Sequence, residues 1–385
     1  MVKEGAGMEK RRLEKLGIET SLLGFGCMRF PVISGRTIDE AEAEKMLDKA
    51  MAAGVNYYDT AYVYHGGDSE IFTGKVLKKY PRESFYLATK LPVWLVKTAE
   101  DVDKYCKEQL ERLQTEYVDF YLLHNIGIDG WKQFKALGGV ERLEALRAEG
   151  RIRYIGYSCH DSYEGFAEVL NDYDWDFCQI QFNYMDQQEQ AGLKGYELAA
   201  QKNIPMIVME PVKGGSLACF TDEINQKFYA MDSEATVASY ALRWAASYPN
   251  IKVVLSGMST MEQVEDNLKT FSSFKPLTAE EKEGIDEIVE SMRNRVKNGC
   301  TGCRYCMPCP VGVDIPGSFK AWNNYYMYEN YNDVKWDWEH EIGEAHQPKN
   351  CVKCGKCEAA CPQKISIRED LQKAQADLDK REMVR

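Results

Sequence analysis

The chain has 385 residues, of which 44% are hydrophobic and 28% charged, and its formal net charge is −12. These values are those of a globular protein, and the length suits one large α/β barrel followed by a small module. The acidic balance argues against nonspecific binding to nucleic acid, which needs a basic surface. No apolar run approaches the ~20 residues that a membrane-spanning helix requires.

The first residues and the cysteines bear on the compartment. Segment 1–17 carries positive charge but lacks the apolar stretch of a secretory signal. Thirteen cysteines in such a chain point to thiols that bind metal or pack in the core rather than to disulfides. We therefore expect a cytoplasmic protein.

Eight short apolar segments have the length and composition of β-strands, and helical patterns separate them. The predicted strands are 21–26, 56–61, 85–91, 118–125, 153–158, 177–184, 205–211 and 252–257. Helices are predicted at 39–54, 98–117 and 234–248, with Gly54 ending the first and Ser233 capping the third. Eight strands followed by helices in roughly 260 residues predict an α/β fold, the (β/α)8 TIM barrel. A doubly wound fold is the alternative, but Arg29 stands where its GxGxxG fingerprint needs a third glycine.

Polar residues occur where several predicted strands end, which is where TIM barrels place their chemistry. They are Asp59, Tyr64, Lys90 and His124. A phenol is a weak acid at neutral pH, and a buried lysine beside it is expected to lower its pKa. An aspartate would hold that lysine, and a histidine would orient a carbonyl group. Together these groups predict protonation of a carbonyl oxygen while hydride reaches its carbon.

Two runs of cysteines near the C-terminus have the spacing of iron–sulfur ligands. They are Cys300, Cys303, Cys306 and Cys309 before Pro310, and Cys351, Cys354, Cys357 and Cys361 before Pro362. In two-cluster ferredoxins the cysteine before proline ligates the other cluster. The second run fits this spacing, whereas the first is one residue short before Cys309. Two [4Fe–4S] clusters are predicted; zinc, which also binds CxxC pairs, is the alternative.

The cysteine runs define a second domain. A charged helix at 277–299 links it to the barrel, so we predict a barrel at 1–292 and a small ferredoxin-like iron–sulfur domain with a charged tail at 293–385. Segment 319–341 is rich in Trp and Tyr. We expect it to pack the small domain against the barrel and to keep water from the metal.

With four matching residues in order at its strand ends, the barrel resembles an aldo-keto reductase over roughly residues 10–275. The fused module resembles the ferredoxin-tailed branch of that family. The resemblance makes Asp59, Tyr64, Lys90 and His124 the catalytic tetrad, with Tyr64 as general acid and base. It implies an oxidoreductase that uses NADPH or NADH to reduce an aldehyde or ketone, or that runs the reverse alcohol oxidation.

The same resemblance implies which residues hold the nicotinamide cofactor across the barrel mouth. Ser158 and Gln179 would bind the carboxamide, with Gln181 as an alternative on the same strand face. Members that prefer NADPH often carry lysine and arginine where this chain has Gly257 and Gln263, so NADH is expected equally. The predicted set is Gly26, Met28, Asp59, Ser158, Gln179, Met209, Pro211, Val212, Gly214, Gly215, Leu217, Ser256, Gly257, Met258, Gln263 and Asn267.

Three functions fit this sequence, because the barrel chemistry moves two electrons as hydride whereas each cluster carries one. The first is a carbonyl reductase or alcohol dehydrogenase whose clusters are structural or report redox state. The second is an electron-transfer enzyme with a ferredoxin or flavoprotein partner. The third is a non-catalytic nicotinamide-binding sensor, against which the intact tetrad argues. A flavin would join the two kinds of transfer, but we find no flavin signature.

The predicted partner is a small carbonyl or alcohol substrate, with no nucleic acid and no membrane. Its identity is open. The side chains expected to line the barrel mouth are Arg29, Phe30, Trp94, Asn125 and Trp131.

Overall fold

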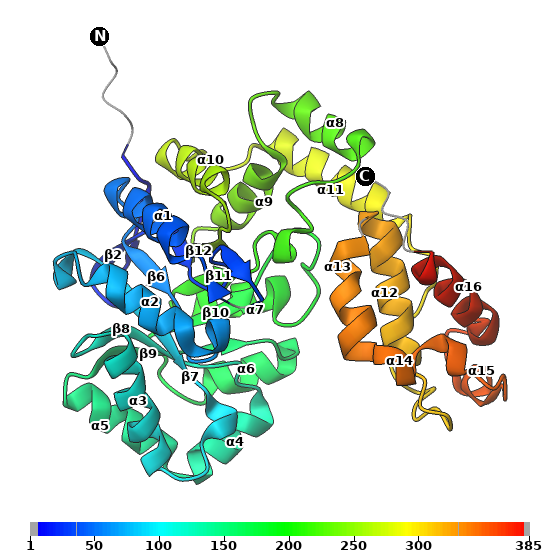
Figure 1. The fold of residues 1–385 in the computed structure, drawn as a ribbon, viewed down its shortest axis with the longest axis horizontal. Helices are drawn as coiled ribbons and strands as arrows, with labels where there is room; N and C mark the ends of the chain where they lie inside the picture. Colours follow the sequence, from blue (N-terminus) through cyan, green and yellow to red (C-terminus); the bar gives the residue numbers. More distant parts are fainter. Residues whose placement is uncertain (1–6, 36, 330, 381–385) are drawn as a thin grey trace. The chain divides into compact units, whose positions relative to one another are not determined.

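The computed structural model describes residues 7–35, 37–329 and 331–380, with the backbone alone at 331–333. The chain divides into two compact units (Figure 1). The first contains the chain up to Val212 together with Ser239–Leu277, and the second contains Lys213–Ala238 and the chain from Thr278 on. The domain boundary expected at residue 292 lies inside helix α11 (Ala279–Arg293) of the second unit.

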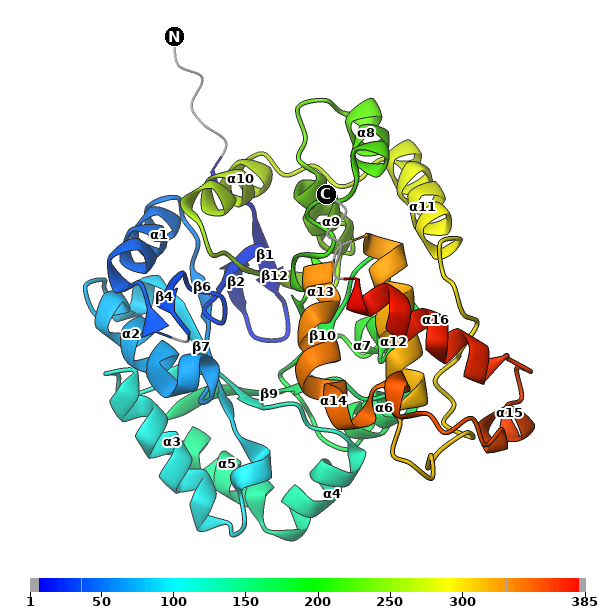
Figure 2. The same cartoon turned by 45° about the vertical axis from the view of Figure 1, so that its right-hand side comes forward.

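Eight parallel strands close into a barrel in the first unit, which confirms the predicted TIM barrel (Figure 2). Each predicted strand is present, and β12 pairs with β3 to close the ring. In barrel order the strands are β3 (Leu23–Gly26), β6 (Tyr57–Asp59), β7 (Tyr86–Leu91), β8 (Val118–Leu123), β9 (Ile152–Cys159), β10 (Phe177–Gln181), β11 (Met206–Met209) and β12 (Ile251–Gly257).

An antiparallel hairpin packs at the amino-terminal end of the barrel strands. Its strands are β1 (Lys10–Leu13) and β2 (Ile18–Ser21). Leu13 is fully buried in a core with Tyr57, Phe177 and Val253, which lie at or near the starts of their strands. Because this end is filled, access to the barrel is left to the carboxyl ends of the strands, where Asp59 and Gly257 lie. A second short pair, β4 (Val32–Ser34) and β5 (Thr37–Ile38), follows β3.

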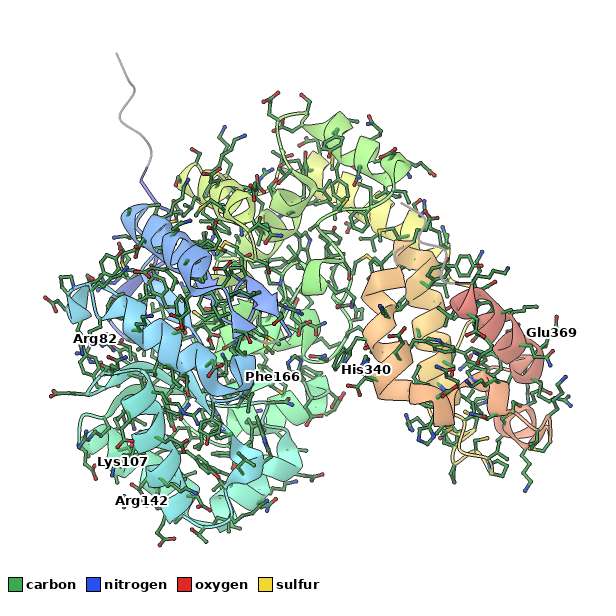
Figure 3. The ribbon with its side chains drawn as sticks, in the orientation of Figure 1. Arg82, Lys107, Arg142, Phe166, His340 and Glu369 are labelled. Atoms are coloured by element: carbon green, nitrogen blue, oxygen red, sulfur yellow. The ribbon has the colours of Figure 1, made fainter. Side chains whose placement is uncertain are left out.

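Amphipathic helices follow the strands. They are α1 (Glu40–Ala52), α2 (Asp68–Leu77), α3 (Glu100–Arg112), α4 (Ile128–Ala136), α5 (Gly139–Ala148), α6 (Tyr163–Asn171), α7 (Gly192–Gln201), α9 (Val237–Ala246) and α10 (Met261–Ser272). Figure 3 shows the two faces of such helices: Phe166 of α6 is fully buried, whereas Lys107 of α3 is exposed. Asp39 caps α1, and Gly54 follows it at φ +93°, as expected for a helix end. The prediction for α9 is wrong at its start, because Ser233 lies in a turn and the helix begins at Val237.

The second unit is helical. It contains α8 (Asp222–Met231), α11, α12 (Ile315–Tyr328), α13 (Tyr331–Trp336), α14 (Gly343–His346), α15 (Lys356–Ala360) and α16 (Ile367–Asp379). Helix α11 begins with a capping box between Thr278 and Glu281. Its Met292 is fully buried, and Lys227 of α8 donates to Ser291 of α11 at 3.3 Å. The predicted linker helix therefore packs within this unit.

Helices α12 and α16 form the core of the cysteine-bearing part. Phe319 and Trp322 of α12 are buried, and the indole of Trp322 donates to Asp377 of α16 at 2.9 Å. Leu371 and Leu378 of α16 are also buried, so the segment expected to be a charged tail is an amphipathic helix with a core face. The aromatic segment packs in this core, next to the cysteines. That it also packs against the barrel stays a prediction. Among the described residues, none of the helices is long and apolar enough to cross a membrane.

Candidate active site and cysteine-lined pockets

Lys90 joins three of the four predicted catalytic residues at the carboxyl end of the barrel. Its ammonium group donates to Asp59 Oδ1 at 2.5 Å, to the carbonyl oxygen of Thr60 at 2.8 Å and to Tyr64 Oη at 3.3 Å. Lys90 and Asp59 are 1% and 3% exposed. The register explains this proximity, because β6 and β7 are neighbours and Asp59 pairs with Ala88, two residues before Lys90.

A tight turn brings Tyr64 over Lys90. Tyr64 begins a short 3₁₀ segment, η1 (Tyr64–Gly67), which leads into α2. Within it Gly66 and Gly67 have φ of +73° and +108°, a region that favours glycine. The Tyr64 ring centroid consequently lies 4.9 Å from Lys90 Nζ.

His124 completes the set. It follows β8, and its backbone N–H donates to Leu91 O at 3.0 Å, which fixes it beside the strand of Lys90. Its ring meets the edge of Tyr64 at a centroid distance of 6.0 Å, and Trp94 lies 5.2 Å away on the same ring. Within the described part of the chain, His124 Nδ1 is buried and has no hydrogen-bond partner. A buried polar atom without a partner is a candidate contact for a ligand.

Burial governs the protonation of this site. It raises the pKa of Tyr64, although the charge of Lys90 acts in the opposite direction, so the expected net lowering of that pKa is not what the structure has. Burial alone would lower the pKa of Lys90, but Asp59 and Tyr64 outweigh it and raise that pKa. Burial and the Lys90 charge lower the pKa of His124 to about 3. The lysine is therefore charged and the histidine neutral at physiological pH.

The strand ends beside Asp59 carry glycine. Gly26 pairs in register with Asp59 on one side and with Gly257 on the other. A Cβ atom at Gly26 would lie 3.2 Å from the carbonyl oxygen of Ser256, and one at Gly257 would lie 2.7 Å from Arg29 Cγ. Two neighbouring strands, β3 and β12, thus end in glycine, and a side chain at either position would press on Ser256 or on Arg29.

The two candidates for carboxamide binding differ in their contacts. Gln179 is buried and pairs in register with Ser158, and its Oε1 has no partner among the described residues. Gln181 is already engaged, because it donates to Asp186 at 2.7 Å and accepts from Gln190 at 3.2 Å. Ser158 Oγ accepts the backbone N–H of Asn125 at 2.8 Å. Gln179 is therefore the glutamine with a free acceptor.

The last strand, the loop after it and α10 hold further residues of the predicted cofactor-binding set. Asn267 is buried and its amide donates to Ser256 Oγ at 2.8 Å. Gln263 is exposed and its side chain accepts the backbone N–H of Ser259 at 2.7 Å, so it helps to cap α10. Met258 is buried, whereas Met28 in the first loop is 51% exposed.

Several residues of the predicted cofactor-binding set lie at the end of β11 and just after it. Met209 ends β11 half-buried, and Pro211 and Val212 are the last residues of that stretch of the first unit. Gly214, Gly215 and Leu217 belong to the second unit, where the 3₁₀ segment η4 (Lys213–Gly215) has Gly214 and Gly215 at φ of +67° and +112°. Ser216 N–H donates to Lys213 O at 3.1 Å inside this turn.

Two residues expected at the barrel mouth lie in the core instead. Phe30 is 3% exposed and packs edge-on against Phe72. Trp131 is 1% exposed, and its indole donates to Asp172 at 2.7 Å. The prediction for both is wrong, because their rings pack against other aromatic side chains in the core. Trp94 is 45% exposed beside His124, as expected for a mouth residue.

A buried polar cluster behind Lys90 escaped the sequence analysis. Glu70 accepts from Thr89 at 2.6 Å and from Gln109 at 2.8 Å, and Gln109 also donates to the carbonyl oxygen of Lys90 at 3.0 Å. Arg112 pairs with Glu70 at 3.2 Å. These contacts fix the strand that carries Lys90. The only signal in the sequence was a glutamine on the apolar face of α3.

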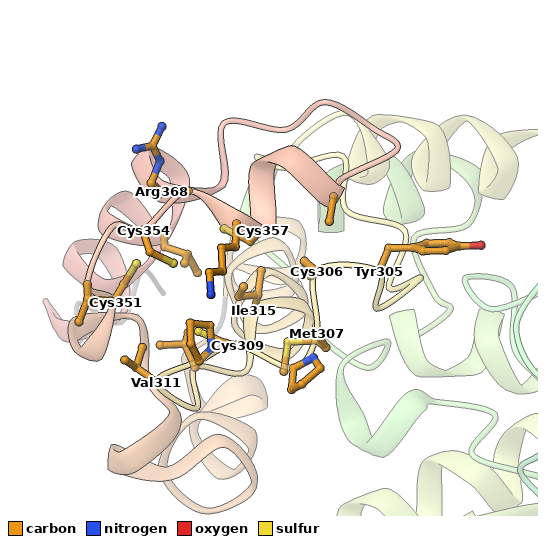
Figure 4. Close-up of a pocket in the computed structure, with 18 residues that line it drawn as sticks. Tyr305, Cys306, Met307, Cys309, Val311, Ile315, Cys351, Cys354, Cys357 and Arg368 are labelled. Atoms are coloured by element: carbon orange, nitrogen blue, oxygen red, sulfur yellow. The ribbon is translucent and has the colours of Figure 1, made fainter.

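The eight cysteines line two adjacent cavities, and the runs cross between them. Cys309 lines a cavity of about 180 Å³ with Cys351, Cys354 and Cys357 (Figure 4). Cys361 lines the other with Cys300, Cys303 and Cys306, and Cys306 borders both. Within the described ranges, no three His, Cys, Asp or Glu side chains gather closely enough to hold a single metal ion. Five cysteines line the first cavity and four the second, which is enough in each for an iron–sulfur cluster, whose ligands are spread over its corners.

Each of the two parts matches a family of known proteins. The sequence model of the aldo/keto reductase family matches residues 22–290, and that of the 4Fe-4S dicluster domain matches residues 299–365. The chain therefore belongs to the aldo/keto reductase family and is an oxidoreductase with a C-terminal 4Fe-4S domain. This confirms the predicted family, its ferredoxin-tailed branch and the enzyme class.

The individual relatives share only about a third of their residues or fewer with this chain. A probable aldo-keto reductase 1 of Glycine max is 31% identical over 161 residues, which are 40% of this chain and 45% of that protein. The L-galactose dehydrogenase of Arabidopsis thaliana is 28% identical over 322 residues, 76% of this chain and 96% of that protein. Among solved structures, aldo-keto reductase AKR11C1 from Bacillus halodurans in its holo form is 28% identical with a TM-score of 0.62, over 73% of this chain and 96% of that one.

Proposed function

We propose that the barrel reduces an aldehyde or ketone with NADPH or NADH, or oxidises the corresponding alcohol. The observation that supports this most is Lys90 Nζ, which is buried and reaches both Asp59 and Tyr64. An ammonium group held 3.3 Å from a phenol stabilises the phenolate that forms when the phenol gives up its proton. Tyr64 is therefore the general acid in reduction and the general base in oxidation.

Asp59 and Lys90 act through Tyr64. Asp59 keeps Lys90 charged and in place, and Thr60 O fixes a second of its hydrogens. The burial that raises the pKa of Tyr64 keeps the phenol protonated before reaction, so that its proton is available for the carbonyl oxygen. A bound nicotinamide would supply the hydride. Removal of the lysine charge would leave the phenolate without its stabilising neighbour.

His124 orients the substrate. With its pKa lowered to about 3 it is neutral, so it can donate or accept one hydrogen bond without competing for the proton of Tyr64. Trp94 offers an exposed ring beside it. A flat, partly apolar substrate fits such a surface. The similarity to an L-galactose dehydrogenase adds sugars to that class, because sugars also stack on aromatic rings.

The cofactor would lie across the strand ends next to Asp59. Two of these strands end in Gly26 and Gly257, and the free Oε1 of Gln179, with Ser158 beside it, would receive the carboxamide. Gly257 and Gln263 offer no positive charge to a 2′-phosphate. NADH is therefore expected to serve about as well as NADPH.

For the second unit we propose two [4Fe–4S] clusters, each held by three cysteines of one run and the last cysteine of the other. The ligand sets would be Cys300, Cys303, Cys306 and Cys361, and Cys309, Cys351, Cys354 and Cys357. The spacing of the thiols supports this over zinc, since a zinc site needs four ligands around one point and no three such side chains among the described residues gather that closely.

A second candidate function is electron transfer with a protein partner. It is favoured by Cys306, which borders both cavities, because two neighbouring clusters form a path for electrons whereas one is enough to stabilise a fold. In the first candidate the clusters are structural or report redox state. A nicotinamide-binding sensor without catalysis has less support, because the contacts of Lys90 are those that a proton-transfer site needs.

An anaerobic titration with NADH and NADPH tests both candidates, after assays of iron, sulfide and flavin. Nucleotide oxidation with a panel of aldehydes and ketones is expected for the barrel. Reduction of the clusters by either nucleotide, followed by visible absorbance and electron paramagnetic resonance, would favour electron transfer. Clusters that stay oxidised in a flavin-free protein would favour the reductase with structural or sensing clusters. No turnover of any carbonyl would contradict the first proposal.

A further inference from the structure

The cavity lined by Cys309, Cys351, Cys354 and Cys357 opens onto a surface with exposed apolar side chains. Tyr305, Val311 and Val352 line it and are 70%, 37% and 62% exposed. Tyr305 and Val311 are labelled in Figure 4. The described residues around the other cysteine cavity include no exposed large apolar side chain. Apolar side chains left in water around one site only are typical of an interaction surface.

The segment that carries Cys351, Cys354 and Cys357 is basic, although the chain as a whole is acidic. Segment 349–368 contains five basic residues and one acidic residue: Lys349, Lys353, Lys356, Lys364 and Arg368 against Glu358. The whole chain has 48 basic and 60 acidic residues. Lys349 and Arg368 are paired with carboxylates. Lys353 and Lys356 are exposed, flank Cys354, and have no ion pair within the described residues.

We propose that this surface, made of Tyr305, Val311, Val352, Lys353 and Lys356, docks an acidic one-electron carrier protein of the ferredoxin type. The proposal rests on the electron-transfer function proposed above. Unpaired lysines attract an acidic partner and speed its encounter, and the apolar side chains exclude water from the contact. Cys354 is exposed between the two lysines, so the partner's redox centre would come close to the group that this cavity holds.

Each encounter with such a partner would transfer one electron. One electron leaves the reduced carrier and enters the cluster held by Cys309, Cys351, Cys354 and Cys357, so the carrier is oxidised as the cluster is reduced. Two encounters would leave one electron on each of the two proposed clusters and two molecules of the carrier oxidised. Nucleic acid also binds lysine side chains through its phosphates, but three exposed apolar side chains beside them would add little to that contact.

The test measures binding of the iron-loaded full chain to a purified acidic two-[4Fe–4S] ferredoxin by anaerobic calorimetry, at low and at high salt. The variant K353E/K356E reverses the two unpaired charges. The control K202E/K282E makes the same change in net charge at two exposed lysines far along the chain. Iron and sulfide are assayed in every protein. A single-stranded oligonucleotide and a cationic cytochrome c serve as comparison probes.

We expect the ferredoxin to bind, binding to weaken roughly three- to tenfold in K353E/K356E, and the control to keep wild-type affinity. Binding should also weaken at high salt, because exposed charges are screened. Absence of ferredoxin binding, equal loss in both variants, or tighter binding of the oligonucleotide or cytochrome c would overturn the proposal. If K353E/K356E loses iron, K353Q/K356Q takes its place. A wild-type chain without iron would instead contradict the cluster proposal.

Discussion

The two units hold their reactive side chains in opposite ways. In the barrel, Lys90 and Asp59 are 1% and 3% exposed and touch each other at 2.5 Å. In the second unit, Cys303 and Cys354 are exposed and several other cysteines are half-buried on irregular backbone. Parallel strands set the first arrangement, whereas turns and the packing of α12 on α16 set the second.

This difference teaches where each unit obtains its order. The barrel site is organised by the core itself, so its charges are already in position before any ligand binds. A group bound in the cysteine cavities would supply part of the free energy that orders their turns. Loss of the ligand group should therefore affect the second unit far more than the first.

The largest expected effect is the removal of a crossed cysteine. In Cys309→Ser, iron should fall from about eight to about four atoms per chain, because only the cavity with Cys351, Cys354 and Cys357 loses a ligand. Iron and sulfide assays with electron paramagnetic resonance check this. Cys219→Ser, which alters an exposed cysteine outside both runs, should keep all of the iron. Unchanged iron in Cys309→Ser would contradict the crossed ligand sets.

Next is Tyr64→Phe, which removes the proposed proton donor and keeps the ring. Carbonyl reduction should fall about 10²- to 10⁴-fold, while quenching of protein fluorescence by NADPH or NADH should still report binding. Tyr62→Phe is the matched control, since the Tyr62 hydroxyl donates to Glu108 at 3.1 Å and is not the hydroxyl beside Lys90. Activity that survives in Tyr64→Phe would mean that another group gives the proton.

A smaller effect concerns acid stability. His124 has an ordinary pKa of 6.5 and, in the fold, one of about 3, so the unfolded chain binds an extra proton between these values. The barrel should therefore lose stability as the pH falls below about 6.5, by at most about 1.4 kcal/mol per pH unit from this residue.

His124→Gln should reduce this pH dependence, and His340→Gln, at an exposed site in the second unit, should not. Hydrogen exchange of the β7 and β8 amides at increasing denaturant, repeated from pH 5 to 8, measures the free energy of unfolding of the barrel in each protein. Identical pH profiles for wild type and His124→Gln would show that the ring is not buried in its neutral form.

The smallest expected effect separates two glutamines on one strand. Gln179→Leu should weaken nicotinamide binding by about 1 kcal/mol, roughly a fivefold rise in Kd, because it removes the unpaired acceptor. Gln181→Leu should chiefly lower stability, since Gln181 ties Asp186 and Gln190 together. Titration with NADH and thermal unfolding distinguish the two. If only Gln181→Leu weakened NADH binding, Gln181 and not Gln179 would be the residue that binds the nicotinamide.

Local patterns in the sequence were enough for the architecture and for many of the candidate residues. Period and length predicted all eight barrel strands, and strand ends pointed to Asp59, Tyr64, Lys90 and His124. The sequence-based predictions were wrong where the same local pattern is compatible with more than one structure. Ser233 is a good helix cap by type, yet it lies in a turn, and α16 buries Leu371 and Leu378 although its composition is that of a charged tail.

The sequence by itself determined the barrel, its family and the presence of iron–sulfur ligands, because these depend on periodicity and on spacing along the chain. Tertiary structure alone decided that Gln179 rather than Gln181 keeps a free acceptor and that burial raises the pKa of Tyr64 despite Lys90. These outcomes depend on which distant segments pack together and on how much water they exclude. No local pattern in the chain encodes either quantity.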